Sequence, residues 1–141
     1  MEKISASGRN YLAGTSSVLS MGEDRLQMNY EVYGVYVDDT GKGLLHDSTV
    51  YCMGSLHAIK GEYEETGFMV FNPPDGDKAY ATYKATGKVG ESAKGTYTWT
   101  GGTGKYTGLQ GGGEFTRYQL NNATEQVFAS VSIAKGSYTL S

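Results

Sequence analysis

Polar and apolar residues alternate with a period of two along most of the chain, and no stretch of ten or more residues places apolar positions at helical spacing. In the clearest case, between Gln27 and Val37, one face carries Met28, Tyr30, Val32 and Tyr36. Because successive side chains of a strand point to opposite faces, this pattern predicts a long strand with one buried face. Helix is therefore expected to be a minor component.

Similar alternation predicts strands at about residues 48–60, 62–71, 78–86, 93–100, 115–120, 126–134 and 137–140, with a weaker one between residues 3 and 19. Sequences rich in Gly, Asp, Asn and Pro separate them, as at residues 38–43 and 72–77, and Asn121-Asn122 is expected to join two strands. Gly54 is interpreted as a bend or bulge within its strand. In residues 78–86 we expect the alanine face to point inward.

About eight strands that follow one another closely favour antiparallel pairing between neighbours. Closing such a sheet removes the exposed edges that would otherwise promote aggregation. We therefore predict that residues 1–141 form a single all-β domain, a small antiparallel β-barrel. A β-sandwich is the alternative.

Glycine and tyrosine dominate the composition, with 21 Gly and 12 Tyr but only 2 Pro. Glycine at about twice its average usage, without a collagen period, is typical of a fold with many tight turns and close backbone approaches. The net charge is -3 and the 12 Lys and Arg residues are dispersed. Because nucleic-acid binding depends on clustered cations, nucleic acid is not an expected partner.

The single cysteine, Cys52, cannot form an intramolecular disulfide. No apolar segment reaches the ~18 residues of a membrane span, and no basic and apolar leader is recognisable. A cytoplasmic location is the resulting expectation.

One glycine-rich segment, GTYTWTGGTGKYTGLQG at residues 95–111, contains the pattern GGTGKY-x-G-x-x-G. It resembles a signature of the allene oxide cyclase-like barrel, and plant dirigent proteins and a set of small bacterial proteins share similar glycines. Physically, we interpret the motif as a tight turn followed by one helical or irregular turn, after which the next strand begins at Gly112 or Gly113. An anion-binding nest at residues 101–104 is the alternative interpretation.

The resemblance implies a barrel that holds an apolar ligand, but the polar site residues of the cyclases cannot be matched to positions in this chain. We therefore expect a small-molecule barrel that binds an apolar or aromatic metabolite, with a cofactor-independent isomerase or cyclase as its enzymatic form. A non-catalytic, lipocalin-like carrier and a structural or oligomeric module with a filled barrel are the alternatives. Whether the protein is an enzyme or a homo-oligomer stays open.

Two residues are catalytic candidates. Glu65 alternates with Tyr63, Met69 and Phe71, and a carboxylate among aromatic rings acquires a raised pKa suited to acid-base chemistry. A structural ion pair with a cation such as Arg117 is the competing interpretation. His57 is either a base or a surface residue.

Candidate ligand-binding residues are aromatic or lie near the candidate carboxylate: Tyr30, Tyr83, Tyr97, Trp99, Phe115, Arg117 and Cys52. An inward Arg117 would either neutralise Glu65 or hold a ligand carboxylate. Cys52 is expected to be a small buried hydrophobe. His46 and His57 are far apart and have no cysteine pair beside them, so we expect neither a metal site nor a cofactor.

Overall fold

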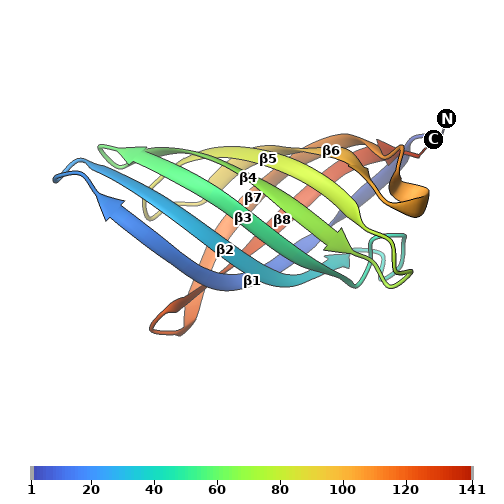
Figure 1. Ribbon diagram of the computed structural model, residues 1–141, viewed down its shortest axis with the longest axis horizontal. Coiled ribbons are helices and arrows are strands. Elements are labelled where there is room, and N and C mark those ends of the chain that lie inside the picture. Colours follow the sequence, from blue (N-terminus) through green and yellow to red (C-terminus); the bar gives the residue numbers. More distant parts are fainter. Residues whose placement is uncertain (1, 141) are drawn as a thin grey trace.

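Eight antiparallel strands form a closed barrel in a computed structural model that describes residues 2–140 (Figure 1). Each strand pairs with the next in sequence, and β8 closes the barrel against β1. The strands are β1 (Ile4–Ser20), β2 (Arg25–Asp38), β3 (Ser48–Ile59), β4 (Glu62–Asn72), β5 (Ala79–Lys88), β6 (Ala93–Gly102), β7 (Gln110–Thr124) and β8 (Val127–Thr139), and one 3-10 turn, η1 (Gly104–Tyr106), precedes β7. The predicted all-β barrel is thus confirmed, and the sandwich alternative is excluded.

Three regions of the chain differ from what the sequence indicated. The weak segment at the start of the chain is β1, which at 17 residues is longer than any other strand. Asn121 and Asn122 lie within β7, and the chain turns after Thr124, so the prediction of a connection at the two asparagines was wrong. Residues 137–139 belong to β8 and do not form a separate strand. Pairing with β8, which continues to Thr124 and Val127 past an irregularity after Leu120, outweighs the local preference of Asn-Asn for a turn.

The two ends of the barrel differ in how they are covered. Short turns join β1 to β2, β3 to β4, β5 to β6 and β7 to β8 at one end, on the left in Figure 1. The longer connection at residues 39–47 and the η1 segment lie at the other end, where Leu45, Tyr106 and Leu109 are buried. The barrel is therefore covered by its own chain at the η1 end.

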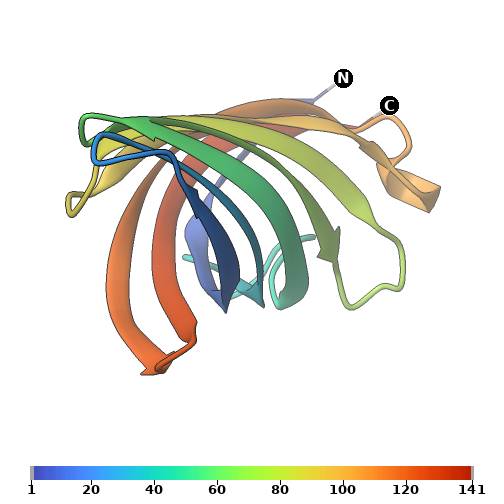
Figure 2. The same ribbon diagram turned by 60° about the vertical axis from the view of Figure 1, so that its left-hand side comes forward.

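At the end with short turns, the β1–β2 and β7–β8 hairpins extend beyond the strands that flank them. β1 pairs with β8 only as far as Gly14 and Phe128, while the rest of β1 pairs with β2 alone. β7 likewise loses its β6 partner after Arg117. Figure 2 shows the β7–β8 hairpin diverging from the β1–β2 hairpin. The barrel accordingly flares at this end.

Small residues inside the barrel make room for aromatic rings. Ala79, Ala81 and Ala85 are buried on the inner face of β5, which confirms the predicted orientation of that strand. Gly54 pairs in register with Tyr30 and with Gly67, so the predicted bulge is absent there. A Cβ at Gly54 would lie 2.5 Å from the Tyr30 hydroxyl, so this glycine is needed for a close side-chain approach.

The glycine-rich motif acts as a structural connection at the η1 end. Gly101 and Gly104 have φ values of +124° and +55°, which favour glycine. A Cβ at Gly102 would lie 2.7 Å from Cβ of the fully buried Tyr106. The predicted turn and single helical turn are present, although the following strand begins at Gln110 and not at Gly112 or Gly113.

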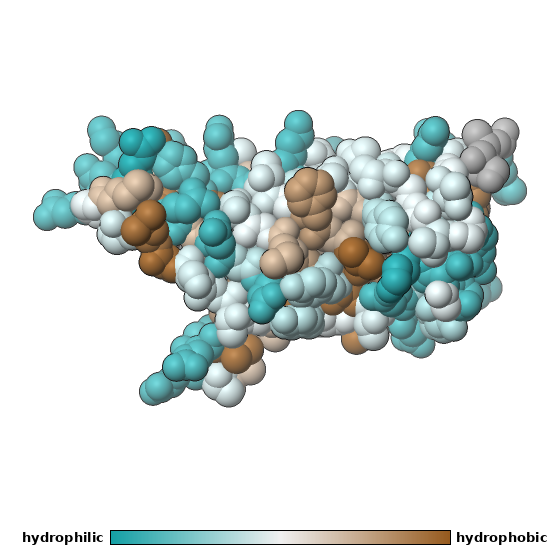
Figure 3. Space-filling model, in the orientation of Figure 1, coloured by the Kyte–Doolittle hydropathy of each residue, from teal (hydrophilic) through white to brown (hydrophobic). Residues whose placement is uncertain are grey.

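The outer surface is mostly polar at the two ends and less so in the middle. In Figure 3, hydrophilic atoms gather at the ends and hairpin tips, and white to brown atoms predominate between them. Tyr33, Met53 and Phe68 are among the exposed large side chains of the outer face. Within residues 2–140, no helix is long and apolar enough to cross a membrane.

Candidate functional site

A cavity of about 730 Å³ occupies the barrel lumen. Its wall is mostly apolar and is made by inward side chains of all eight strands. Val18 and Val89 line it near the short turns and are 60% and 63% exposed, so the cavity opens to solvent at the flared end. Towards η1 it reaches Leu45, which is buried. The lumen is thus a pocket that opens to solvent at the flared end.

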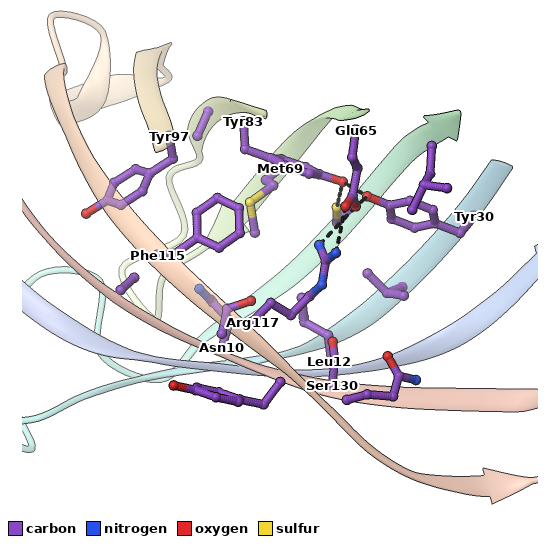
Figure 4. Close-up of a pocket in the computed structure, with 18 of the residues that line it drawn as sticks. Asn10, Leu12, Tyr30, Glu65, Met69, Tyr83, Tyr97, Phe115, Arg117 and Ser130 are labelled. Atoms are coloured by element: carbon purple, nitrogen blue, oxygen red, sulfur yellow. Dashed lines mark hydrogen bonds and ion pairs between the residues drawn. The ribbon is translucent and has the colours of Figure 1, made fainter. Parts of the chain in front are cut away.

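An ion pair crosses this pocket. Glu65 projects from β4 and Arg117 from β7, and the guanidinium binds both carboxylate oxygens, with Nη1–Oε2 at 2.9 Å and Nη2–Oε1 at 2.6 Å (Figure 4). The Glu65 side chain is 1% exposed and that of Arg117 is 19% exposed. Glu65 therefore has the cationic partner that sequence reasoning offered as an alternative to a catalytic role.

Two tyrosines extend the polar cluster along the wall. Tyr30 on β2 and Tyr83 on β5 are separated by β3 and β4, yet their hydroxyl groups are hydrogen-bonded to each other. They meet because the positions between them in the same row are Gly54 and Gly67, which have no side chains to block the rings. The Tyr30 hydroxyl also donates a hydrogen bond to Oε2 of Glu65.

Only one assignment of donors and acceptors fits the hydrogen bonds of this cluster. A tyrosine hydroxyl has a single proton, and Tyr30 gives its proton to Glu65, so Tyr83 donates to Tyr30. The Cys52 thiol then donates to the Tyr83 hydroxyl, with Sγ–Oη at 3.2 Å. A continuous chain of hydrogen bonds runs from Cys52 to the carboxylate.

Burial keeps the neutral members of this chain protonated. Desolvation is the main cause that raises the pKa of Tyr30 and of Tyr83 above its ordinary value, and it raises the pKa of the Cys52 thiol to about 11. Burial opposes the charge of Arg117, but the hydrogen bonds and the charge of Glu65 outweigh it and raise the pKa of that guanidinium. The charged groups of the cluster are thus those of the Glu65–Arg117 ion pair.

Apolar groups lie on both sides of the polar cluster. Towards the mouth, Leu56, Ala58, Tyr63 and Ala93 form a small cluster, with Met28 packed against it. Towards η1, a larger group includes Phe71, packed edge-on against Trp99 at 5.0 Å between ring centroids. A bound molecule would thus meet polar atoms partway along an otherwise apolar pocket.

The structure brings most of the candidate residues to the lumen. Those that line the cavity are Glu65, Tyr30, Tyr83, Tyr97, Trp99, Phe115, Arg117 and Cys52. His57 does not join them: it shares the outer face of β3 with Tyr51 and Met53, where Arg25 Nε donates to its Nε2 at 3.0 Å. His46 accepts a hydrogen bond from the Asp38 amide at the η1 end.

Sequence reasoning did not single out the polar groups on the β1 and β8 wall. Asn10, Ser130 and Ser132 are all buried and line the cavity. The signal was available, because Asn10 alternates with Leu12 and Ser132 with Ala134 on the inner faces of their strands. Asn10 lies in the segment with the weakest strand pattern, and the sequence alone does not say which face of residues 126–134 points inward.

Among residues 2–140, no group of three or more His, Cys, Asp or Glu side chains is placed to hold a metal ion. The sequence matches none of the protein-family models compared with it, and no curated protein is significantly similar to it.

Proposed function

We propose that this protein binds a small, mainly apolar molecule, lipid-like or aromatic, in the lumen of its barrel. The observation that carries the proposal is the cavity of about 730 Å³ with apolar walls and a buried polar cluster at mid-depth. Ligand pockets typically measure roughly 300–1,000 Å³ and combine apolar walls with a few convergent polar groups. A hollow of this size counts against a structural module with a filled barrel.

Arg117 is the group best suited to orient such a ligand. Its guanidinium has five N–H donors, of which the bidentate pair with Glu65 uses two. The remaining donors can bind a carbonyl, ether or hydroxyl oxygen of a molecule in the pocket. The rings of Tyr83 and Phe115, which pack edge-on with their centroids 6.1 Å apart, offer an apolar surface beside the guanidinium.

Trp99 gives the test, because it is the only tryptophan and it lines the cavity. Titration with 1-decanol and with naphthalene should change its emission saturably. Ala81→Phe, which fills the lumen, should weaken binding of both probes at least tenfold, while the outward Thr82→Phe on the same strand should not. If the emission stays flat with both probes, or if Ala81→Phe binds them as well as the parent does, the proposal fails.

An isomerase or cyclase that needs no cofactor is a second candidate. The observation in its favour is the hydrogen-bonded chain that ends on the Glu65 carboxylate inside an apolar pocket. A carboxylate in such a place can take a proton from a bound carbonyl compound and return it at another position. A non-catalytic carrier in the manner of lipocalins would use the same pocket without proton transfer.

Deuterium exchange separates the enzyme from the carrier. With 2-decanone in D₂O, the enzyme hypothesis expects deuterium at the α-carbon, counted by mass spectrometry, at a rate above that of buffer. The double variant E65Q/R117Q removes the carboxylate without leaving an unpaired buried charge, and it should bind the ketone but lose the exchange. Binding by the parent without exchange would favour the carrier.

The glycine-rich motif at residues 95–111 is the observation that supports a relation to the allene oxide cyclase-like barrel. Membership of that family remains a proposal. A cytoplasmic location and a homo-oligomeric state likewise remain predictions from the sequence, and sedimentation analysis of the purified protein tests the second.

A further inference from the structure

One buried polar side chain of the lumen has an acceptor atom without a hydrogen-bond partner in the part of the chain that the structure describes. Asn10 on β1 is 6% exposed and lines the cavity, and its Oδ1 atom has no hydrogen-bond partner among residues 2–140. A buried acceptor left unpaired destabilises a protein, whereas a leucine of similar shape would pack without that loss. An unpaired amide in this position indicates a partner that is not part of the chain.

Asn10 continues the polar cluster along the part of the wall that carries Arg117. Across the β7, β8 and β1 strands, Arg117 is paired with Ser132, and Ser132 is paired with Asn10. Since neighbouring strands lie about 4.8 Å apart, the row places the backbone positions of Arg117 and Asn10 about 10 Å from each other. Figure 4 shows both side chains in the pocket, with Asn10 and Arg117 approaching it from the same side.

The chemistry of Asn10 defines the group that would bind there. Its carboxamide has an acceptor oxygen and two N–H donors, and rotation about the Cβ–Cγ bond exchanges their positions. A hydroxyl group both donates and accepts. A ligand hydroxyl can therefore donate a hydrogen bond to Oδ1 of Asn10 and, from the same position, accept one from the Ser132 hydroxyl. An ether or a ketone can accept only, and it would leave Oδ1 unpaired.

The charges of the pocket restrict the rest of the ligand. Glu65 and Arg117 neutralise each other, and the other charged residue lining the cavity, Glu91, is exposed at the mouth. A carboxylate ligand would bring a negative charge into a site whose cation is already paired, and burying an unpaired charge is costly. The pocket therefore suits an uncharged molecule.

We infer that the ligand is a neutral, apolar alcohol whose hydroxyl group donates a hydrogen bond to Oδ1 of Asn10. This inference rests on the proposed function, and it adds the class of ligand and the residue that selects it. The hydrocarbon part lies between the aromatic side chains on the η1 side of the lumen, and the Glu65–Arg117 pair stays intact.

Three probes of equal chain length test the inference through the emission of Trp99: 1-decanol, decyl methyl ether and decanoate. In the parent protein the alcohol should bind about tenfold more tightly than the ether, which is the usual value of one buried hydrogen bond. Decanoate should bind more weakly than the alcohol at neutral pH. In Asn10→Leu the alcohol and the ether should bind equally, while Asn29→Leu, on the outer face of β2, should keep the tenfold preference.

The melting temperature without ligand gives a second readout. Asn10→Leu removes the unpaired acceptor and should raise it by about 3–5 °C. If leucine over-packs the wall, Asn10→Ala is used in place of Asn10→Leu in the binding comparison.

Equal binding of alcohol and ether by the parent protein overturns the inference, and this is also the result expected if Asn10 only holds a water molecule. A preference that persists in Asn10→Leu overturns it as well. If none of the three probes alters Trp99 emission, the proposed function itself fails, so the two failures are distinguishable.

Discussion

Arg117 on β7 binds both carboxylate oxygens of Glu65 on β4, although β5 and β6 separate the two strands in the barrel wall. The contact therefore passes through the lumen and not along the wall. Because Glu65 is almost completely buried, each residue of the pair prevents the other from being an unpaired buried charge. The polar cluster around them is a fixed part of an otherwise apolar pocket.

Removal of one partner of this pair should be far more damaging than removal of both. Glu65→Leu leaves the Arg117 charge buried and should lower the free energy of unfolding by about 3–5 kcal/mol. The double variant Glu65→Leu/Arg117→Met replaces the pair by apolar groups and should recover most of the loss. Urea denaturation measures both values, and a single variant as stable as the double variant would contradict the assigned geometry.

Gly67 should not tolerate even a methyl group. A Cβ at this position would lie 2.5 Å from Cε1 of Tyr83, so Gly67→Ala should lower the free energy of unfolding by about 1–3 kcal/mol through over-packing. Thr66→Ala, which changes the adjacent outward position, should stay within about 0.5 kcal/mol of the parent.

The loss at Gly67 should also depend on Tyr83. In a Tyr83→Leu background, where the ring is absent, Gly67→Ala should be much less destabilising, and a double-mutant cycle measures this coupling. Strictly additive effects would show that the tyrosine does not lie over the glycine.

The Cys52 thiol should react slowly at neutral pH. Burial raises its pKa to about 11, so the reactive thiolate is scarce in the folded protein, and the cavity wall restricts access. Mass spectrometry should show alkylation by iodoacetamide that is much slower than in urea, and slower again when decanol fills the pocket. Fast labelling of the folded protein at pH 7 would place Cys52 outside the lumen.

Stability should decline in alkaline solution, partly because of Cys52. The folded state keeps the thiol proton up to a pKa of about 11, whereas the unfolded chain releases it near the ordinary value of about 8.5. The resulting contribution to stability is complete below pH ~8.5 and is lost as the pH rises through about 11. Burial raises the pKa of Tyr30 and Tyr83 in the same direction, so they add to the effect.

Urea denaturation at pH 8 and pH 10.5 measures this alkaline loss of stability. Cys52→Ala should lose less free energy of unfolding between the two pH values than the parent does. An equal loss in both proteins would assign the whole effect to the tyrosines.

The fold could be predicted from the sequence because a period of two records which face of a strand is buried. The same period separated Met28 and Tyr30 from the outward residues of β2, and it put His57 on the face opposite Cys52. His57 was kept as a candidate because the sequence alone did not say which face of β3 was inside. Once Cys52 is known to face the lumen, the period excludes His57 from it.

The remaining features depend on the pairing of strands, which local sequence does not specify. Gly54 could be understood only when its neighbours across the sheet were known to be Tyr30 and Gly67. The pairing of Glu65 with Arg117 was one of two interpretations until the barrel brought β4 and β7 to face each other. The length of β7 past Asn122 likewise follows from its pairing with β8.

The central claim is that an apolar molecule enters the lumen, and nuclear magnetic resonance can place it there directly. With 1-decanol bound, intermolecular NOEs should connect its chain to methyl groups of the inward residues Val32, Leu56 and Met69. They should be absent from the outward Val35 and Ile133, which are exposed on the outer face. NOEs confined to those outer methyl groups, or none at all at saturating decanol, would contradict the account.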